Sequence, residues 1–428
     1  MIQTPLKEDF IHFIWRTKRI APADLVTTDG ILVDVADYGV YNVDAGPDFF
    51  NGKIKINDTV WAGNIEMHVF SSDWHKHKHQ HDEAYNNVIL HVVYEHDEEV
   101  LDPTGKPIPT IALKGKIPKV VLDNYLTLVQ SFNDIPCAAM IHKVEEAKIE
   151  FWKYKLTIER LNKKAEYVQT LLIQNNGDWE ETLYQLLARY YGSKVNIEPF
   201  EALARSLPLS ILQKNKDKKA IITALLFGQA GMLEANYQDQ YFLDLKKEYD
   251  FQKSKYNLRT INKMTWKFSK LRPVNFPTIR IAQFAALMSN VQFLFSKIKD
   301  NSDPKYIKTL LQSVPDDYWD ERYRFDTEAA FLPKKMGEDG INLLMINAIA
   351  PLLFSYGRAI DDEKYVDAAI TILDDIHAET NVITKQWKSL GIKVKSAFDS
   401  QALVHLKTTY CDLRRCLSCK IGNEIIKG

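Results

Sequence analysis

The sequence predicts an α+β protein in which an N-terminal α/β core precedes a mainly α-helical domain. Two observations lead to this prediction: hydrophobic residues change from strand-like to helical spacing along the chain, and the net charge changes sign. Residues 1–115 carry 10 Lys/Arg against 18 Asp/Glu, a net charge of −8, whereas the remainder carries 45 against 38, a net charge of +7. We therefore expect an α/β domain at 1–115, a linker at 116–143 and a helical domain with a C-terminal cysteine motif at 144–428.

The α/β core is expected to contain a helix, three strands, a short helix and a strand. The helix is predicted within residues 7–18, where Phe10, Ile11 and Ile14 have helical spacing. Alternating or β-branched runs predict strands, and polar residues with helical length but weak periodicity predict the short helix. The strands are expected at 31–35, 53–56 and 61–70, the short helix within 73–85, and further strands at 88–94 and 110–113.

Helical spacing dominates from residue 144 onward. No fixed period indicates a solenoid, so a compact helical domain is expected. The strongest apolar faces lie at 149–174, 179–191, 220–227, 279–298, 341–354 and 365–376.

Composition limits the class of protein. With 428 residues, of which 46% are hydrophobic and 26% charged, the chain can fill two or three cores. The N-terminus lacks the pattern of a secretory signal, and we expect no membrane-spanning segment. Three of the four cysteines fall in the last 18 residues, which is not the distribution of a disulfide framework. These features predict a cytoplasmic protein with no membrane partner, and they leave its oligomeric state undetermined.

An acidic and histidine-containing cluster is the main candidate site. Asp48 follows a Gly-Pro turn, and Glu66 and His68 lie two residues apart on a predicted strand, so they point to one face. Two carboxylates can bind Mg²⁺ or Mn²⁺, and a third polar group can position or deprotonate a water molecule. The alternative is that a turn aspartate and a strand glutamate are ordinary surface residues.

The order of elements and these residues resemble the PD-(D/E)XK nuclease superfamily over residues 5–97. The resemblance implies that Glu8 is the helical acid, Asp48 the aspartate after Pro47, and Glu66 the acid of the E-x-K motif. His68 stands where the superfamily has lysine, and it lacks the permanent charge of an ammonium group. DNA or RNA is the partner that the resemblance implies.

A run of alternating histidines, His75, His77, His79 and His81, follows the strand of Glu66. Such runs are often solvated and bind transition metals adventitiously. Alternatively, His75 or His77 joins His68 and Asp48 around one tetrahedral zinc ion, as in a zinc-dependent hydrolase.

The cysteines are the second candidate site. Cys411, Cys416 and Cys419 have C-x4-C-x2-C spacing, which suits a structural Zn²⁺ or an iron–sulfur cluster if Cys137 supplies a fourth ligand. Some PD-(D/E)XK nucleases resemble this arrangement, although their distant cysteine precedes the nuclease core. The alternative is four reduced, partly buried thiols.

Arg272 and Arg280 are candidates for contact with nucleic-acid phosphates, and Trp266 and Phe276 for base stacking. The alternative is that these residues anchor one part of the protein on another.

The segments AGPDFFNGKIKI, WAGNIEMHVFSSDWHKH, LLFGQAGML and RPVNFPTIRIAQ are similar to an uncharacterised bacterial family, domain of unknown function 2851. That resemblance implies one integrated protein and no particular substrate. The leading hypothesis is a divalent-metal-dependent, nuclease-like phosphodiester hydrolase. The alternatives are a zinc-dependent hydrolase and a non-catalytic scaffold that binds nucleic acid or protein through a degenerate nuclease-like core.

Overall fold

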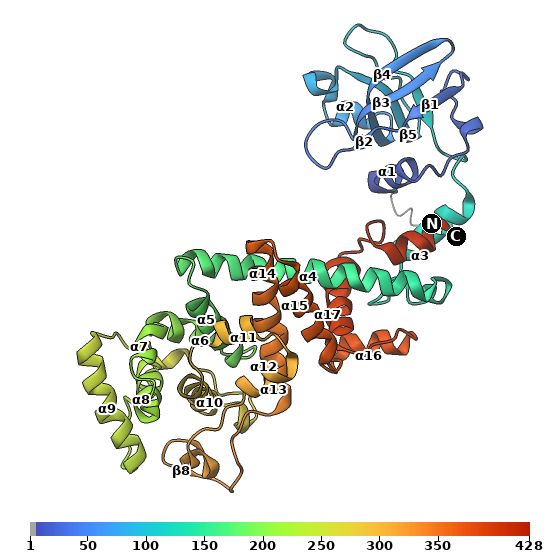
Figure 1. Cartoon of the computed structure of the whole chain (residues 1–428). Helices are drawn as coiled ribbons and strands as arrows, with labels where there is room; N and C mark the ends of the chain where they lie inside the picture. The colour runs from blue at the N-terminus through green and yellow to red at the C-terminus, as the bar shows by residue number, and fades with distance from the viewer. Residues whose placement is uncertain (1–5) are drawn as a thin grey trace. The chain divides into compact units, whose positions relative to one another are not determined.

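Residues 6–115 fold around one mixed sheet in the computed structural model, which describes residues 6–428 (Figure 1). With 54% of the residues in helices and a curled sheet, the chain has the predicted mixed α+β class. The elements that build the sheet and its first helix are α1 (Glu8–Arg16), β1 (Val33–Asp37), β2 (Val40–Tyr41), β3 (Phe49–Ile56), β4 (Thr59–Phe70), β5 (Val88–Glu95) and β6 (Thr110–Ala112).

The sheet has the order β1-β3-β4-β5-β6, and β2 pairs with β3. β3 runs antiparallel to β1 and β4, whereas β4, β5 and β6 are parallel. Gly63 permits the close approach of β4 to β5, since a Cβ atom there would lie 2.6 Å from the carbonyl oxygen of Asn87. α1 packs against β4 through a fully buried apolar face, comprising Phe10, Ile11, Phe13, Ile14 and Trp15.

The helix predicted within residues 73–85 was wrong in extent. Only α2 (Asp73–Lys76) is α-helical, and two 3₁₀ turns follow at His79–His81 and Glu83–Tyr85. Lys78 has φ 64°, a left-handed conformation that interrupts a right-handed helix. The polar run lacks an apolar face, so no packing favours a continuous helix over turns.

The chain divides into two units: one contains residues up to Trp152 together with Leu406–Gly428, and the other contains Lys153–His405. This division differs from the one predicted, because the C-terminal helix α18 (Lys420–Lys427) packs with α3 (Lys119–Val129) inside the supposed linker. The side-chain amide of Asn124 donates to the carbonyl of Ile425 at 2.8 Å. Helical spacing in a sequence indicates that a helix has an apolar face, but it does not indicate which core that face packs into. For this reason the C-terminal residues were predicted to belong to the helical domain at 144–428.

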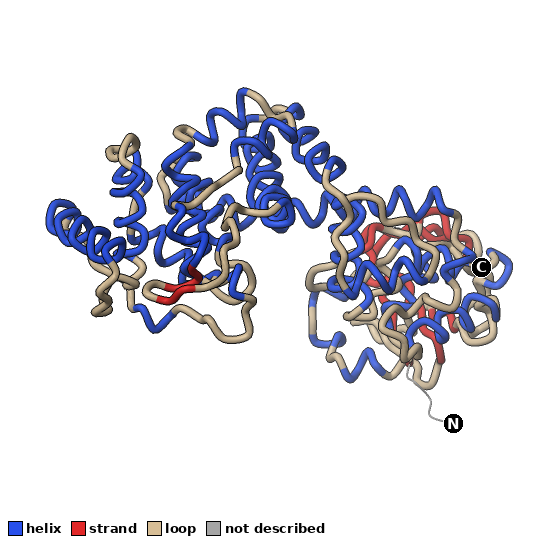
Figure 2. The backbone as a smooth tube through the Cα atoms, turned by 90° about the horizontal axis from the view of Figure 1, so that it is seen from below, coloured by secondary structure: helices blue, strands red, loops and turns tan. Residues whose placement is uncertain are grey.

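The second unit is almost wholly helical. Figure 2 shows the sheet strands gathered in the first unit, apart from a hairpin of β7 (Arg322–Arg324) and β8 (Thr327–Glu328). A π-helix, Met345–Ile349, joins α13 to α14. The helices begin with the remainder of α4 (Glu146–Gln174) and continue as α5 (Trp179–Tyr191), α6 (Ile197–Ser206), α7 (Leu209–Gln213), α8 (Lys219–Gln229), α9 (Gln240–Tyr256), α10 (Pro277–Asn290), α11 (Leu294–Asp300), α12 (Pro304–Leu310), α13 (Glu338–Leu344), α14 (Ala350–Ile360), α15 (Glu363–Asp375), α16 (Val382–Ser389) and α17 (Ala397–His405).

One continuous helical stretch, Glu338–Ile360, is long and apolar enough to cross a membrane by length and composition. Its most apolar window is 67% buried within the structure. Many of its side chains belong to the large apolar core of the second unit, including those of Ile341, Leu344, Ile349 and Leu353. Core helices commonly pass this test, so the stretch is weak evidence for a membrane span.

Candidate metal centre

Asp48 and Glu66 face each other where β3 begins beside β4. The antiparallel register pairs Phe49 with Ile65, which places Asp48 opposite Glu66. The backbone N–H of Asp48 donates to Oε2 of Glu66 at 3.1 Å, and the N–H of Met67 donates to Oδ2 of Asp48 at 2.9 Å. The pairing of β3 with β4 therefore brings the two predicted acids into one site.

The turn before Asp48 is held by Asn42. Its side-chain amide donates to the carbonyl oxygens of Asp44 and Pro47, at 3.0 and 3.1 Å. These bonds close the Asp44 to Pro47 turn and fix the point at which Asp48 enters the sheet.

The carboxyl group of Glu66 is almost completely enclosed, with 4% of the residue exposed. Burial, followed by the negative charge of Asp48, raises the pKa of Glu66 well above its ordinary value. When two carboxyl groups lie side by side in a desolvated site, either one of them is protonated and uncharged or the pair binds a cation.

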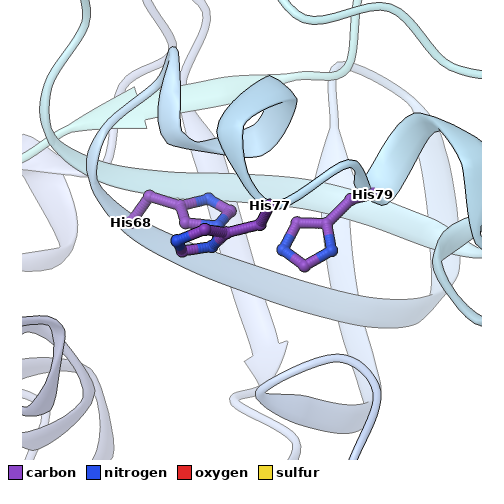
Figure 3. A group of neighbouring side chains, drawn as sticks. All are labelled: His68, His77 and His79. Atoms are coloured by element: carbon purple, nitrogen blue, oxygen red, sulfur yellow. The ribbon is translucent and has the colours of Figure 1, made fainter.

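Three histidines, His68, His77 and His79, lie together (Figure 3), and two of them approach Glu66. Nε2 of His68 lies 3.2 Å from Nδ1 of His77 and 3.6 Å from Oε1 of Glu66, and Nε2 of His79 lies 3.4 Å from the same oxygen. One ring nitrogen from each of His68, His77 and His79 falls within a group whose atoms are all within 4.8 Å of one another. The strand supplies His68 and the following turn supplies His77 and His79.

The buried imidazoles of the cluster are neutral. Burial, then neighbouring histidines, lowers the pKa of His68 to about 2. Burial also lowers the pKa of His79 to about 4 and that of His91 to about 3. Neutral imidazole is the form that binds metal ions. His91, on β5, fixes the opposite side of the His68 ring through a 2.8 Å contact between its Nε2 and Nδ1 of His68.

Several buried ring nitrogens lack a hydrogen-bond partner, among them Nε2 of His79 and both ring nitrogens of His12. Nε2 of His12 lies 3.1 Å from Oδ2 of Asp48, a short distance without hydrogen-bond geometry. Imidazole nitrogens that face carboxylate oxygens in this way fit a cation site, because one cation can be bound by the nitrogens and the oxygens together.

Glu8, predicted as the helical acid, lies on α1 at the border of the cluster. Burial raises its pKa, the charge of His77 lowers it, and Asp48 raises it further. His12, one turn further along α1, was missed in the sequence analysis. Its spacing of four residues from Glu8 places both on one helix face, and that spacing is the signal that points to it.

The histidine run divides between the site and its surroundings. His77 and His79 join the cluster, whereas His75 lies 3.9 Å from Glu98 and is partly exposed. Of the two histidines considered for a zinc site, the structure therefore places only His77 beside His68.

A cleft of about 550 Å³ adjoins the cluster. His12 belongs both to its wall and to the surroundings of Asp48, and it is the residue that connects the cleft with the acids, neither of which lines the cleft. Four cationic side chains, those of Lys7, Arg16, Arg414 and Arg415, line the cleft together with Tyr41 and Tyr125.

The remaining predicted residues lie elsewhere. Cys137, Cys411, Cys416 and Cys419 are all buried and line one small cavity. In the second unit, Arg280 donates to side-chain oxygens of Asn275 and Gln283 at 2.6 and 3.0 Å, whereas Arg272 is exposed. Contact of either arginine with nucleic acid stays a prediction.

The fold and site together define a two-unit α+β protein with an acid–histidine centre on a mixed sheet. A family model described as "Protein of unknown function (DUF2851)" matches residues 8–382, and the chain belongs to this family. The matched range contains every residue of the acid–histidine centre. Comparison with curated proteins and with solved structures gave no match.

Proposed function

We propose that this protein is a metal-dependent hydrolase of phosphodiesters with a nuclease-like core. The observation that carries the proposal is the convergence of Asp48 and Glu66 with the imidazoles of His68, His77 and His79. Carboxylates and neutral imidazoles gathered in one desolvated site form a donor set for a divalent cation.

The donor set favours an ion that accepts nitrogen ligands. Imidazole suits Zn²⁺ and Mn²⁺ better than Mg²⁺, which prefers an octahedron of oxygens. Asp48 and Glu66 alone would suit Mg²⁺, but the cluster of three histidine ring nitrogens, two of them beside Glu66, shifts the preference. A bound divalent ion supplies a Lewis acid for a phosphate oxygen and lowers the pKa of a bound water molecule.

The protein's own residues would hold and orient the reactants. His91 keeps the His68 ring in one orientation, and the turn closed by Asn42 presents Asp48. Nδ1 and Nε2 of His12 face the border between the acids and the cleft, so His12 can exchange a proton with a group bound there.

The cationic side chains of the cleft support a phosphate-bearing substrate. Lys7, Arg16, Arg414 and Arg415 lie on the same cleft as His12, and guanidinium groups bind phosphate through paired N–H donors. Tyr41, which is partly exposed at the cleft, offers a ring on which a base can stack, whereas Tyr125 is buried and stacked on Phe10. DNA or RNA is the substrate class that this combination favours.

The arrangement of elements supports the likeness to PD-(D/E)XK nucleases. One helix precedes the antiparallel strands β1, β3 and β4, with the short β2 paired to β3, and the parallel β5 follows a crossover; the acids lie just before β3 and on β4. Histidine at position 68 sets this centre apart from the lysine of that superfamily and agrees with an imidazole-bound ion.

Nuclease assays on single- and double-stranded DNA and RNA with Zn²⁺, Mn²⁺ or Mg²⁺ test the proposal. We expect cleavage by the wild type, highest with Zn²⁺ or Mn²⁺, and a loss of at least about 100-fold in Glu66→Gln and His77→Ala. His75→Ala is the matched control, because His75 belongs to the same run but lies beside Glu98, and it should cleave normally.

Failure of the wild type to cleave any of these substrates, although it binds the metal, would contradict the hydrolase and favour the non-catalytic scaffold. Equal activity in wild type and Glu66→Gln would place the reaction elsewhere in the molecule.

A further inference from the structure

All four cysteines of the chain line one cavity, which holds about 10 Å³ of space. Cys137 comes from the segment after α3, Cys411 ends the π-helix Leu406–Cys411, and Cys419 precedes α18. Each of the four residues is 7% exposed, and none forms a disulfide bond. Segments about 274 positions apart in sequence therefore bring their thiols to one place by folding.

The thiols are close enough to influence one another. After burial, the largest influence on the pKa of Cys411 comes from Cys137, then Cys419 and Cys416, and all of these raise it. Cys419 and Cys416 likewise raise the pKa of Cys137. Thiols that line one cavity become metal ligands when a metal displaces their protons.

We propose that Cys137, Cys411, Cys416 and Cys419 form a tetrathiolate site for a structural metal centre. The centre fastens the C-terminal segment to the N-terminal unit. Four thiolates are the ligand set of structural zinc and of iron–sulfur clusters, and no carboxylate lines this cavity.

The backbone around the cavity is tightly fitted. A Cβ atom on Gly422 would lie 2.2 Å from the carbonyl oxygen of Cys416, so only glycine lets α18 approach the turn that carries this cysteine. Asn423 reinforces the turn by donating to the carbonyl oxygens of Leu417 and Cys419. The loop between Cys411 and Cys419 is thus shaped around its thiols.

The distances between the sulfur atoms help to distinguish a single zinc ion from an iron–sulfur cluster. Among residues 6–428, the cysteines do not form a group whose ligand atoms all lie within 4.8 Å, as the three histidines do. A single zinc ion with Zn–S bonds of about 2.3 Å needs its sulfurs about 3.8 Å apart and would draw them together. An iron–sulfur cluster is larger and spans more widely spaced cysteines.

The centre also has a consequence for the cleft, which rests on the proposed function. Arg414 and Arg415 lie between Cys411 and Cys416 and line the cleft beside His12. Arg414 donates to the carbonyl oxygen of Asn133 at 2.9 Å, near Cys137. A metal held by the cysteines would therefore fix the cationic wall of the cleft.

Metal analysis of the full-length protein tests the site, in a His68→Ala/His77→Ala/His79→Ala background that removes the three clustered histidines. The chain is purified with and without oxygen, and zinc, iron and acid-labile sulfide are measured together with the visible spectrum. We expect about one zinc per chain, or iron with a comparable amount of sulfide and visible absorbance if the centre is an iron–sulfur cluster.

Cys416→Ser and Cys419→Ser in that background should lower the metal content at least about tenfold. Ser418→Ala, which alters the same turn without removing a thiol, should retain it. If the cysteine variants do not fold, alkylation of the background protein replaces them: the four thiols should resist iodoacetamide until a chelator is added.

A folded background protein with neither zinc nor iron under both conditions would overturn the proposal. Metal retained by both serine variants, or thiols that react equally with and without chelator, would also overturn it. Because the histidine ligands are absent, these results do not depend on the proposed hydrolase.

Discussion

The properties of the Glu66 carboxyl group are set by the residues around it in the folded protein. The residue is buried on β4, yet Asp48 lies opposite and the imidazoles of His68 and His79 approach one of its oxygens. Placing two carboxyl groups in such a site without a proton or a cation is costly. The metal centre that we propose would offset this cost, because a divalent ion between the two carboxylates neutralises their charge.

Lys164 provides a residue-scale prediction that is independent of any metal. Its ammonium group donates to the carbonyl oxygen of Ile346 and to side-chain oxygens of Asn347 and Gln401, at 3.2, 2.9 and 2.9 Å. Burial, then the charge of Arg160, lowers the pKa of Lys164 to about 7. Between this value and the unfolded pKa of about 10.4, the unfolded chain binds more protons.

The free energy of unfolding should therefore rise with pH between the folded and the unfolded pKa of Lys164. The Lys164→Met variant should lack this part of the pH dependence. Urea unfolding at pH about 7 and about 9.5 measures the difference between wild type and variant. Lys163→Met, at an exposed neighbouring position, is the control and should leave the pH dependence unchanged. The same slope in wild type and Lys164→Met would contradict the assignment.

At the scale of elements, the turn after β4 determines which histidines reach the site. α2 ends at Lys76, and Lys78 adopts φ 64° between His77 and His79. A regular strand or helix would separate the two rings differently, whereas this turn places both beside His68.

Replacing Lys78 tests the turn. Lys78→Val should lower stability by about 1–2 kcal/mol, because a β-branched side chain disfavours the left-handed conformation. It should also weaken metal binding. Lys78→Gly, which adopts this conformation without a steric penalty, should retain both. Thermal unfolding and metal titration measure the two effects, and equal behaviour of both variants would show that the turn conformation is unimportant.

At the scale of the whole molecule, the chain returns to its first unit after completing the second. Leu406–Gly428 belongs with the residues up to Trp152, and Lys148 forms a 2.8 Å ion pair with Glu424. Ile421, Ile425 and Ile426 of α18 are buried. Burial of these side chains contributes about 1.5–3 kcal/mol each by transfer estimates.

Truncation after His405 should consequently destabilise the first unit and spare the second. Hydrogen exchange followed by mass spectrometry should show protection lost in α3 and retained in α8 and α10, whose apolar side chains lie in the core of the second unit. Removal of Met1 and Ile2 serves as a control truncation. Loss of protection in α8 rather than α3 would contradict the division into units.

The sequence by itself determined the mixed class, the positions of the main strands and the candidates Asp48, Glu66 and His68. Local patterns carry this information, because strand and helix spacings and turn residues act over a few positions. The convergence of His12, His77 and His79 on the two acids was decided only by the tertiary structure, as was the meeting of Cys137 with the C-terminal cysteines. These contacts depend on strand register, on the left-handed turn at Lys78 and on the packing of α18 against α3. A short stretch of sequence does not specify with which distant core the apolar face of a helix packs.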